Sequence, residues 1–138
     1  MNKYLLTFIF CLVSFDIFAA SLKIENAWMR EAPPTAKNLA GYVELHNPGS
    51  KTVTITSATS NTFKRVEIHV TSFENGMMRM KEMKTLKINP GETVYFEPGG
   101  KHFMLIKPKV AIKAGLNIPV ILSFDSNKKQ TINFLVRK

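Results

Sequence analysis

The sequence predicts a single all-β domain, folded as a sandwich or a barrel. Short runs rich in β-branched and aromatic residues recur along the chain, and turn-forming residues separate them about every 8–12 positions. No segment of useful length has the apolar spacing of an amphipathic helix. The chain has 138 residues and a hydrophobic fraction of 45%, values that suit one globular domain.

The first three expected strands are separated by segments rich in proline and glycine. Residues 23–30 form the first strand, which ends at a loop with two consecutive prolines. Residues 40–46 alternate between the two faces of a strand and end at Asn47-Pro48-Gly49. Residues 53–58 follow as the third strand. Proline and glycine favour turns, so each of these boundaries is expected to reverse or redirect the chain.

The next two expected strands form a tight hairpin. Residues 65–73 and 77–83 flank Asn75-Gly76. Asn-Gly is the strongest two-residue hairpin signal, because a type I′ turn requires positive φ at both central positions. With these two residues as the loop, Glu74 pairs with Met77, and the register of the whole hairpin follows.

Four more strands complete the expected domain. A Pro-Gly pair precedes the first of them, and Pro-Gly-Gly follows it. The turn between the last two is Asn127-Lys128-Lys129. The sequence contains no internal repeat, no low-complexity segment and no sign of a second domain. The strands are expected at residues 93–96, 102–107, 117–124 and 130–136.

Residues 1–20 have the features of a signal peptide. Lys3 provides a positive charge, residues 4–15 are apolar, and Ala19 and Ala20 offer a small-residue cleavage site. A membrane-spanning helix needs about 20 apolar residues, so this run is too short to anchor the protein. We therefore expect export to the periplasm, with residues 21–138 as the mature domain and no stable insertion in the membrane.

The only cysteine, Cys11, lies within this signal segment. Residues 8–10 do not form the lipobox that would precede a lipid-modified cysteine. The mature chain is therefore expected to carry no lipid at this position, no disulfide and no thiol chemistry, and its core must stabilise the fold.

The formal net charge is +9. The lysines are dispersed along the sequence and form no Arg-rich helix, so nucleic acid is not an expected partner. Two interpretations remain, a solvated basic surface or a surface that docks onto an acidic partner.

The hairpin places a histidine close to a methionine. If Asn75-Gly76 is the loop, Thr71 pairs with Met80 and His69 with Glu82. Side chains alternate between faces, so His69 and Met80 become diagonal neighbours on one face. Diagonal neighbours have Cα atoms about 7–8 Å apart, within reach of long side chains. An imidazole and a thioether can therefore contact the same ion.

A second histidine–methionine pair follows the Pro-Gly-Gly turn. His102 and Met104 are two positions apart in an expected strand and share a face. Together the two pairs provide four candidate metal ligands, His69, Met80, His102 and Met104, if the fold brings them together.

This set of donors favours one Cu(I) ion. Thioether sulfur is soft and neutral, and soft ligands select Cu(I). Zinc sites use cysteine, histidine and carboxylates, whereas calcium and magnesium prefer oxygen. A blue-copper electron-transfer site needs a cysteine thiolate, which the mature chain lacks.

The remaining histidines, methionines and nearby carboxylates have less specific interpretations. Met29, Met77 and Met83 are expected to fill the core. Met78 lies on the site face and is left open between core support and the edge of the site. His46 is expected at the surface beside a turn. Two carboxylates complete the neighbourhood: Glu67 is expected to face away from His69, and Glu82 to lie near the site.

With these four residues at this spacing, the sequence resembles the PCuAC family of periplasmic copper chaperones. His69 is followed by ten residues and Met80, then by twenty-one residues, His102, one residue and Met104. The resemblance extends from about Ala27 to Phe124. Shorter matches flank the four-residue pattern: Ala27-Trp28-Met29-Arg30, Pro33-Pro34, Ala40-Gly41-Tyr42, His46-Asn47-Pro48-Gly49, Val66-Glu67-Ile68-His69, Met78-Arg79-Met80 and Pro98-Gly99-Gly100.

The resemblance implies a cupredoxin-like Greek-key β-barrel or sandwich that binds Cu(I) at its surface through the four residues named. It further implies delivery of copper to cytochrome c oxidase, beside a second chaperone of the Sco type. Some members carry a C-terminal tail rich in histidine and methionine, and this chain ends at Lys138 without one.

These observations predict a monomeric copper carrier and not an enzyme. The sequence shows no Ser/His/Asp arrangement and no thiol nucleophile. The expected partners are copper-accepting proteins, namely a subunit of cytochrome c oxidase and a Sco-like chaperone. Two alternatives remain open: a periplasmic buffer or resistance protein with the same ligands, and a structural β-sandwich that binds no metal.

Overall fold

The computed structural model describes residues 21–138, so the predicted signal peptide lies outside the described residues. Within residues 21–138 the structure consists of strands, and it contains no helix with the length and hydropathy needed to cross a membrane. In chain order the strands are β1 (Lys23–Arg30), β2 (Asn38–His46), β3 (Val53–Thr59), β4 (Phe63–Glu74), β5 (Met77–Glu82), β6 (Leu86–Ile88), β7 (Thr93–Phe96), β8 (Lys101–Pro108), β9 (Asn117–Phe124) and β10 (Lys129–Arg137).

All nine expected strands are confirmed, with ends that differ by at most two residues. The sequence did not predict β6, a strand of three residues. Its hydrogen-bonded partner is β3, where Val53 lies opposite Ile88. A segment this short has too few residues to show alternation, so only its distant neighbour defines it as a strand.

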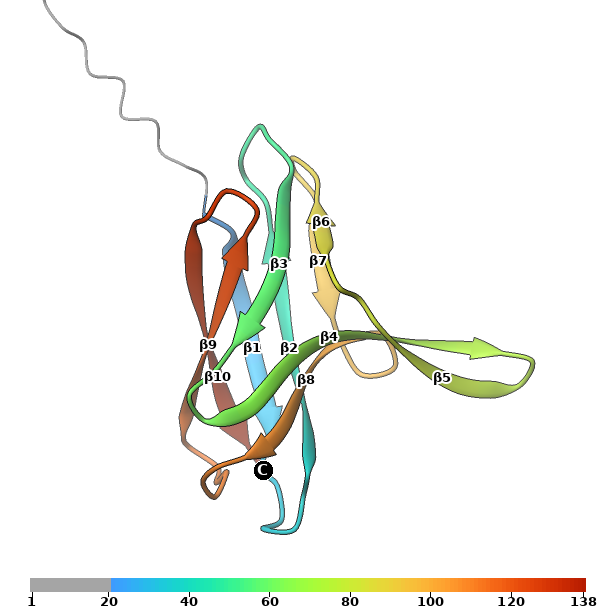
Figure 1. The fold of residues 1–138 in the computed structure, drawn as a ribbon, viewed down its shortest axis with the longest axis vertical. Coiled ribbons are helices and arrows are strands. Elements are labelled where there is room, and N and C mark those ends of the chain that lie inside the picture. The colour runs from blue at the N-terminus through green and yellow to red at the C-terminus, as the bar shows by residue number, and fades with distance from the viewer. Residues whose placement is uncertain (1–20) are drawn as a thin grey trace, which may run out of the picture.

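The strands close into a barrel (Figure 1). Around the barrel, β4 pairs with β8, β8 with β2, β2 with β1, β1 with β10, β10 with β9, β9 with β3, and β3 with β4. The β1–β10 pairing is parallel, and the other pairings of this ring are antiparallel. The predicted all-β barrel is therefore confirmed.

Alternation along the strands separates the barrel interior from the outer wall. In β8, Phe103 and Leu105 are fully buried, whereas Met104 between them points to the outer wall and is half-buried. Phe103 stacks on Phe96, with ring centroids 4.6 Å apart, and meets the edge of Phe134 at 5.7 Å. This aromatic cluster anchors β8 from the inside, directly behind two of the predicted ligands.

The β4–β5 hairpin projects from the barrel as an arm (Figure 1). We define the arm as residues 72–80, because β4 pairs with β8 only as far as Val70. Asn75 and Gly76 have φ values of 53° and 76°, as a type I′ turn requires. The predicted register is confirmed, with Glu74 opposite Met77 and Thr71 opposite Met80.

Candidate metal centre

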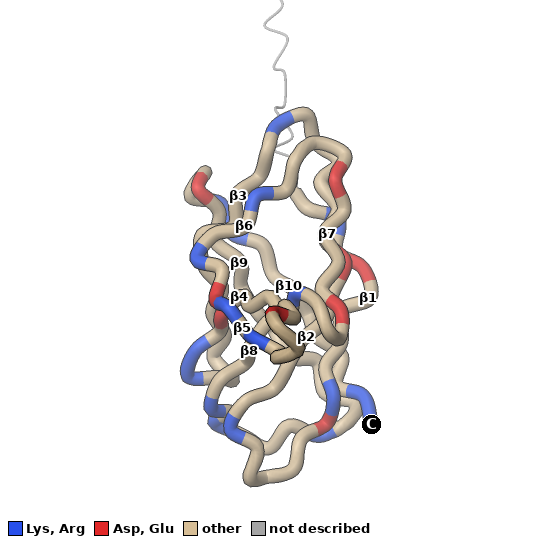
Figure 2. The backbone as a smooth tube through the Cα atoms, turned by 90° about the vertical axis from the view of Figure 1, so that its right-hand side faces the viewer, with Lys and Arg blue, Asp and Glu red and all other residues tan. Residues whose placement is uncertain are grey.

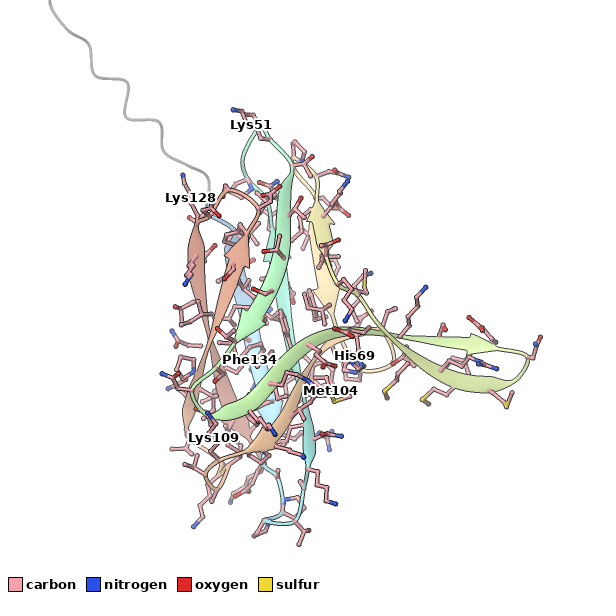
Figure 3. The ribbon with its side chains drawn as sticks, in the orientation of Figure 1. Lys51, His69, Met104, Lys109, Lys128 and Phe134 are labelled. Atoms are coloured by element: carbon pink, nitrogen blue, oxygen red, sulfur yellow. The ribbon has the colours of Figure 1, made fainter. Side chains whose placement is uncertain are left out.

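The candidate site lies on the outer wall of the barrel, where β4, β5 and β8 meet (Figure 3). His69 and His102 are directly opposite each other in the β4–β8 register, and one position along, Ile68 and Phe103 point into the core. The two imidazole centroids are 5.7 Å apart. A first-row metal lies about 2 Å from an imidazole nitrogen, so this separation allows one ion to reach both rings.

A pocket of about 260 Å³ opens beside these rings. Three of the four predicted ligands line it, namely Met80, His102 and Met104. His69 is not among its lining residues but lies directly opposite His102 in the β4–β8 pair. The complete lining is Asn38, Leu39, Ala40, Tyr42, Thr71, Met78, Met80, Gly99, His102 and Met104. The fold thus brings both histidine–methionine pairs to one place, and their role as ligands stays a prediction.

The ring of His69 is oriented by a carboxylate. Its Nε2 lies 2.8 Å from Oε2 of Glu67, and because a carboxylate only accepts, Nε2 carries the proton and donates it. The expectation that Glu67 faces away from His69 is therefore wrong, since residues two positions apart in a strand share a face. Arg65 binds the other oxygen of Glu67. The Nδ1 atom of His69 is left with an unshared electron pair, and it is buried without a hydrogen-bond partner.

His102 has a matching arrangement with the nitrogens exchanged. Its Nδ1 lies 3.3 Å from the carbonyl oxygen of Gly100 and donates to it, which leaves Nε2 with the unshared pair. His102 is only 5% exposed. Burial lowers the pKa of this imidazole, the bond to Gly100 opposes the shift, and the neighbouring His69 adds to it. Because burial disfavours its charged form, His102 is held neutral, as a metal ligand must be.

Glu67 stays ionised beside this pair. The hydrogen bond from His69 lowers the pKa of its carboxyl, partial burial acts in the opposite direction, and Arg65 reinforces the lowering. Metal-bound histidines usually donate their second nitrogen to a carboxylate or a backbone carbonyl, which fixes the ring and raises its basicity. Both histidines here have such a partner, one of each kind.

The two thioethers differ in their surroundings. Met80 is at the base of the arm and is 56% exposed, whereas Met104 is half-buried on the barrel wall opposite Glu67 and Ala40. One sulfur is therefore accessible to solvent and to a partner, and the other is held by the barrel. A cation that contacts both sulfurs spans the arm and the wall.

The structure decides several of the open interpretations. Met29 is fully buried and Met83 packs against the core, as expected. Met77 is exposed on the arm, so its assignment to the core is wrong. Met78 is also exposed and lines the pocket, which places it at the edge of the site. His46 is half-buried at the end of β2, where its Nδ1 contacts Oγ1 of Thr93 at 2.9 Å, away from the candidate site.

Comparison with known families places the chain among its relatives. The LpqE-like family, whose description provisionally names its members as lipoproteins, matches residues 22–136. The chain belongs to this family. Both the matched range and the described residues begin after Cys11, so neither tests lipid attachment there.

Two relatives are longer than the region that they share with this chain. Lxx21020 of Leifsonia xyli subsp. xyli (strain CTCB07), again provisionally named as a lipoprotein, is 30% identical over 115 residues, which cover 83% of this chain and 68% of that protein. RP573 of Rickettsia prowazekii (strain Madrid E) is named as uncharacterized and is 31% identical over 100 residues, which cover 72% of this chain and 55% of its own length. The relatives therefore contain further sequence beyond the matched region.

Solved structures with the same fold include two PCuAC domains and the Cu(I) form of a third protein. The copper-bound PCuAC domain from PmoF2 matches with a TM-score of 0.71 at 21% identity, over 87% of this chain and 96% of that domain. The apo PCuAC domain from PmoF1 matches with a TM-score of 0.70 at 20% identity, over 87% of this chain and 97% of that domain. The solution structure of CuI-DR1885 from Deinococcus radiodurans matches with a TM-score of 0.66 at 23% identity, over 82% of this chain and 76% of that protein. The predicted resemblance to PCuAC domains, and with it the cupredoxin-like barrel, is confirmed.

Proposed function

We propose that this LpqE-like protein is an exported carrier of one Cu(I) ion in the periplasm. His69 would bind the ion through Nδ1, His102 through Nε2, and Met80 and Met104 through sulfur. The observation that carries this proposal is the buried, unpartnered Nδ1 of His69, next to an imidazole whose free nitrogen is Nε2. Buried polar atoms are nearly always paired, so an unpaired electron pair among soft donors fits a metal ligand.

The chemistry of the donors selects the ion. Two neutral imidazoles and two neutral thioethers do not compensate a divalent charge, and thioethers prefer the soft Cu(I) ion. Glu67 and Gly100 orient the imidazoles and fix the tautomers that leave Nδ1 of His69 and Nε2 of His102 free for the ion. The matching PmoF2 and DR1885 structures are named as copper-bound and Cu(I)-bound forms, which supports copper as the cargo here.

The exposure of Met80 supports a role in transfer. An incoming ligand can approach the ion from the arm side while the wall residues still hold it. Thiolates bind Cu(I) more tightly than thioethers do, so a cysteine-containing acceptor would draw the ion away. We propose copper-accepting proteins as partners, specifically a cytochrome c oxidase subunit or a Sco-like chaperone, and we propose that the carrier acts as a monomer.

Titration of the purified mature protein with Cu(I) tests the proposal. In competition with a colorimetric Cu(I) chelator under anaerobic conditions, one equivalent should bind, and X-ray absorption should report nitrogen and sulfur ligands. Binding of Cu(I) at well below one equivalent would leave the structural β-sandwich as the better interpretation.

A periplasmic buffer with the same ligands is the second candidate function, because the donor set does not distinguish storage from delivery. Cells lacking the gene separate the two roles. A delivery protein predicts lower cytochrome c oxidase activity at limiting copper. A buffer predicts normal oxidase activity but poorer growth at high copper.

Glu67→Gln should weaken Cu(I) binding by about tenfold, at the lower end of the effect typical for a partner of a ligating histidine. The neutral amide no longer raises the basicity of His69, and it can turn its donor side toward Nε2. The measurement is a Cu(I) competition titration at pH 7.5.

Glu82→Gln is the matched control for this variant. Glu82 lies opposite His69 in the β4–β5 register, but its carboxylate bonds Lys84 at 2.7 Å. The control removes the same charge and leaves the His69 hydrogen bond intact, so its affinity should stay within about twofold of the wild type. Equal losses in both variants would show that Glu67 acts only through its charge.

Acidification should weaken Cu(I) binding, because a protonated imidazole cannot bind the ion. Burial lowers the pKa of His102 from its ordinary value, so protons compete with the ion for this residue only in the acidic range. Affinity should therefore be nearly constant from pH 8 to 7 and fall steeply by pH 5. Competition titrations across this range provide the measurement, and an affinity unchanged from pH 8 to 5 would exclude two histidine ligands.

A further inference from the structure

The positive charge of the protein is concentrated at one end of the barrel. This end, which we call the basic end, is where β1, β3, β8 and β10 finish and where β2, β4 and β9 begin (Figures 1 and 2). Five exposed lysines lie in its connections or at the adjoining strand ends: Lys37, Lys64, Lys107, Lys109 and Lys113. The last residues of β1 and of the chain add three exposed cations: Arg30, Arg137 and Lys138.

Only one acidic side chain, Glu31, accompanies these eight cations at the basic end. Its side chains therefore carry a net charge of +7, from eight positive and one negative. The other ten cations of residues 21–138 are balanced by eight carboxylates, so the rest of the surface contributes only +2. Backbone hydrogen bonds hold the basic end together: Lys107 N donates to Lys37 O at 2.7 Å, and Ala32 N to Ile112 O at 3.3 Å.

A row of three pockets, which we call the trough, links the basic end with the candidate metal centre through shared lining residues. It begins as a pocket of about 530 Å³ whose lining includes Lys113 and Lys138. That pocket shares Glu31, Ala32 and Pro33 with a second pocket of about 240 Å³. The second pocket in turn shares four residues with the pocket at the metal centre: Asn38, Leu39, Ala40 and Tyr42.

The trough is charged at one end and uncharged at the other. Lys113 and Lys138 line its opening together with Glu31, whereas the stretch nearest to Met104 is lined by uncharged residues of β2. Met104 precedes Lys107 by three positions in β8, a separation of about 10 Å along a strand. A polypeptide segment anchored at the basic end can therefore extend along the wall to the sulfur of Met104.

We propose that the basic end docks the copper-accepting protein through a carboxylate-rich segment of that partner, which lies in the trough and brings the partner's ligands to the metal centre. This inference rests on the proposed function and adds the chemistry of the partner. Complementary charge raises association rates by about 10–10³-fold, and the effect declines with ionic strength. A flat anionic membrane would meet the cations at the end of the barrel but would not enter the trough.

Transfer to a designed peptide tests the inference. The probe is a synthetic peptide with a Cys-x-x-x-Cys acceptor preceded by six glutamates, and its partner probe has six glutamines instead. Stopped-flow transfer from the Cu(I)-loaded protein at 50 mM salt should be at least about tenfold faster to the glutamate peptide. The difference should disappear at 500 mM salt.

Two triple variants locate the docking surface. Lys37→Glu/Lys109→Glu/Lys113→Glu changes the basic end, and Lys51→Glu/Lys128→Glu/Lys129→Glu makes the same change in net charge at the opposite end, where Lys51 and Lys128 are visible (Figure 3). The basic-end variant should transfer to the glutamate peptide at least about tenfold more slowly, and the opposite-end variant within about threefold of the wild type. Equal losses in both variants would overturn the inference, because total charge alone would then explain the rate.

Two further measurements separate the possible failures. Binding of the metal-free protein to a fluorescent glutamate peptide, followed by anisotropy, tests docking without copper. If Cu(I) does not load but the peptide still binds at the basic end, the proposed function fails and the docking surface stands. If the protein sediments with phosphatidylglycerol vesicles through the same lysines while both peptides receive copper at equal rates, the inference of a protein partner is overturned.

Discussion

Met104→Leu should weaken Cu(I) binding by at least about a hundredfold, equivalent to about 2.7 kcal/mol, and Met80→Leu by at least about tenfold. Leucine has nearly the same volume and no sulfur, so each variant removes one ligand without opening the wall. Met104 should matter more, because the barrel wall holds its sulfur in place, whereas the sulfur of Met80 must be ordered together with the exposed arm. Binding of Cu(II), which does not prefer thioethers, should change less than binding of Cu(I) in both variants.

Met77→Leu is the control within the same hairpin. Met77 is also 56% exposed but lies on the opposite face of the arm from Met78 and Met80. Competition titrations of the three variants provide the measurement, and Met77→Leu should match the wild type. If Met80→Leu and Met104→Leu also match it, the assignment of the sulfur ligands is wrong.

Phe103→Ala should lower the free energy of unfolding by about 3–5 kcal/mol, more than any other variant proposed for this protein. The ring is fully buried between Phe96 and Phe134, and its removal leaves a cavity behind β8. The same residue separates His102 from Met104 in the strand. We therefore expect this variant to bind Cu(I) more weakly as well, because the backbone that aligns both ligands loses its anchor. Urea unfolding followed by the fluorescence of Trp28 provides the measurement.

Phe73→Ala is the matched control for this loss. Phe73 is 69% exposed on the arm, so its truncation removes little buried surface and should change stability by less than about 0.5 kcal/mol. Phe103→Leu keeps most of the buried volume and should be intermediate. A Phe103→Ala protein as stable as Phe73→Ala would show that the aromatic cluster does not anchor β8.

Local rules in the sequence predicted the hairpin and its register correctly. Asn75-Gly76 defines the turn, and alternation then places His69, Met80 and their neighbours. The same alternation places Glu67 beside His69, so that contact was predictable and the expectation against it was wrong. The direct pairing of His69 with His102 was not predictable, because it depends on β4 and β8 becoming neighbours through barrel closure.

The clustering of positive charge at the basic end is a second feature that the sequence did not predict. Its cations are scattered from Arg30 to Lys138, and along the chain they look dispersed. They lie close together in the fold because most neighbouring strands are antiparallel, so alternate connections lie at the same end of the barrel. Charge clustering in a β-barrel is thus a property of its connections, and it becomes visible only when the strand order is known.

The arm gives the bound ion a mechanical role. Met80 belongs to the arm, whereas the other three candidate ligands belong to the barrel, so an ion held by all four would cross-link two parts of a domain whose residues 21–138 contain no cysteine. Loading would restrict the motion of the arm and slow amide hydrogen exchange in β5. Release would return that freedom, and the entropy gained would favour unloading. A stiffer arm would therefore hold copper more tightly, and the flexibility of one hairpin would set the balance between retention and release.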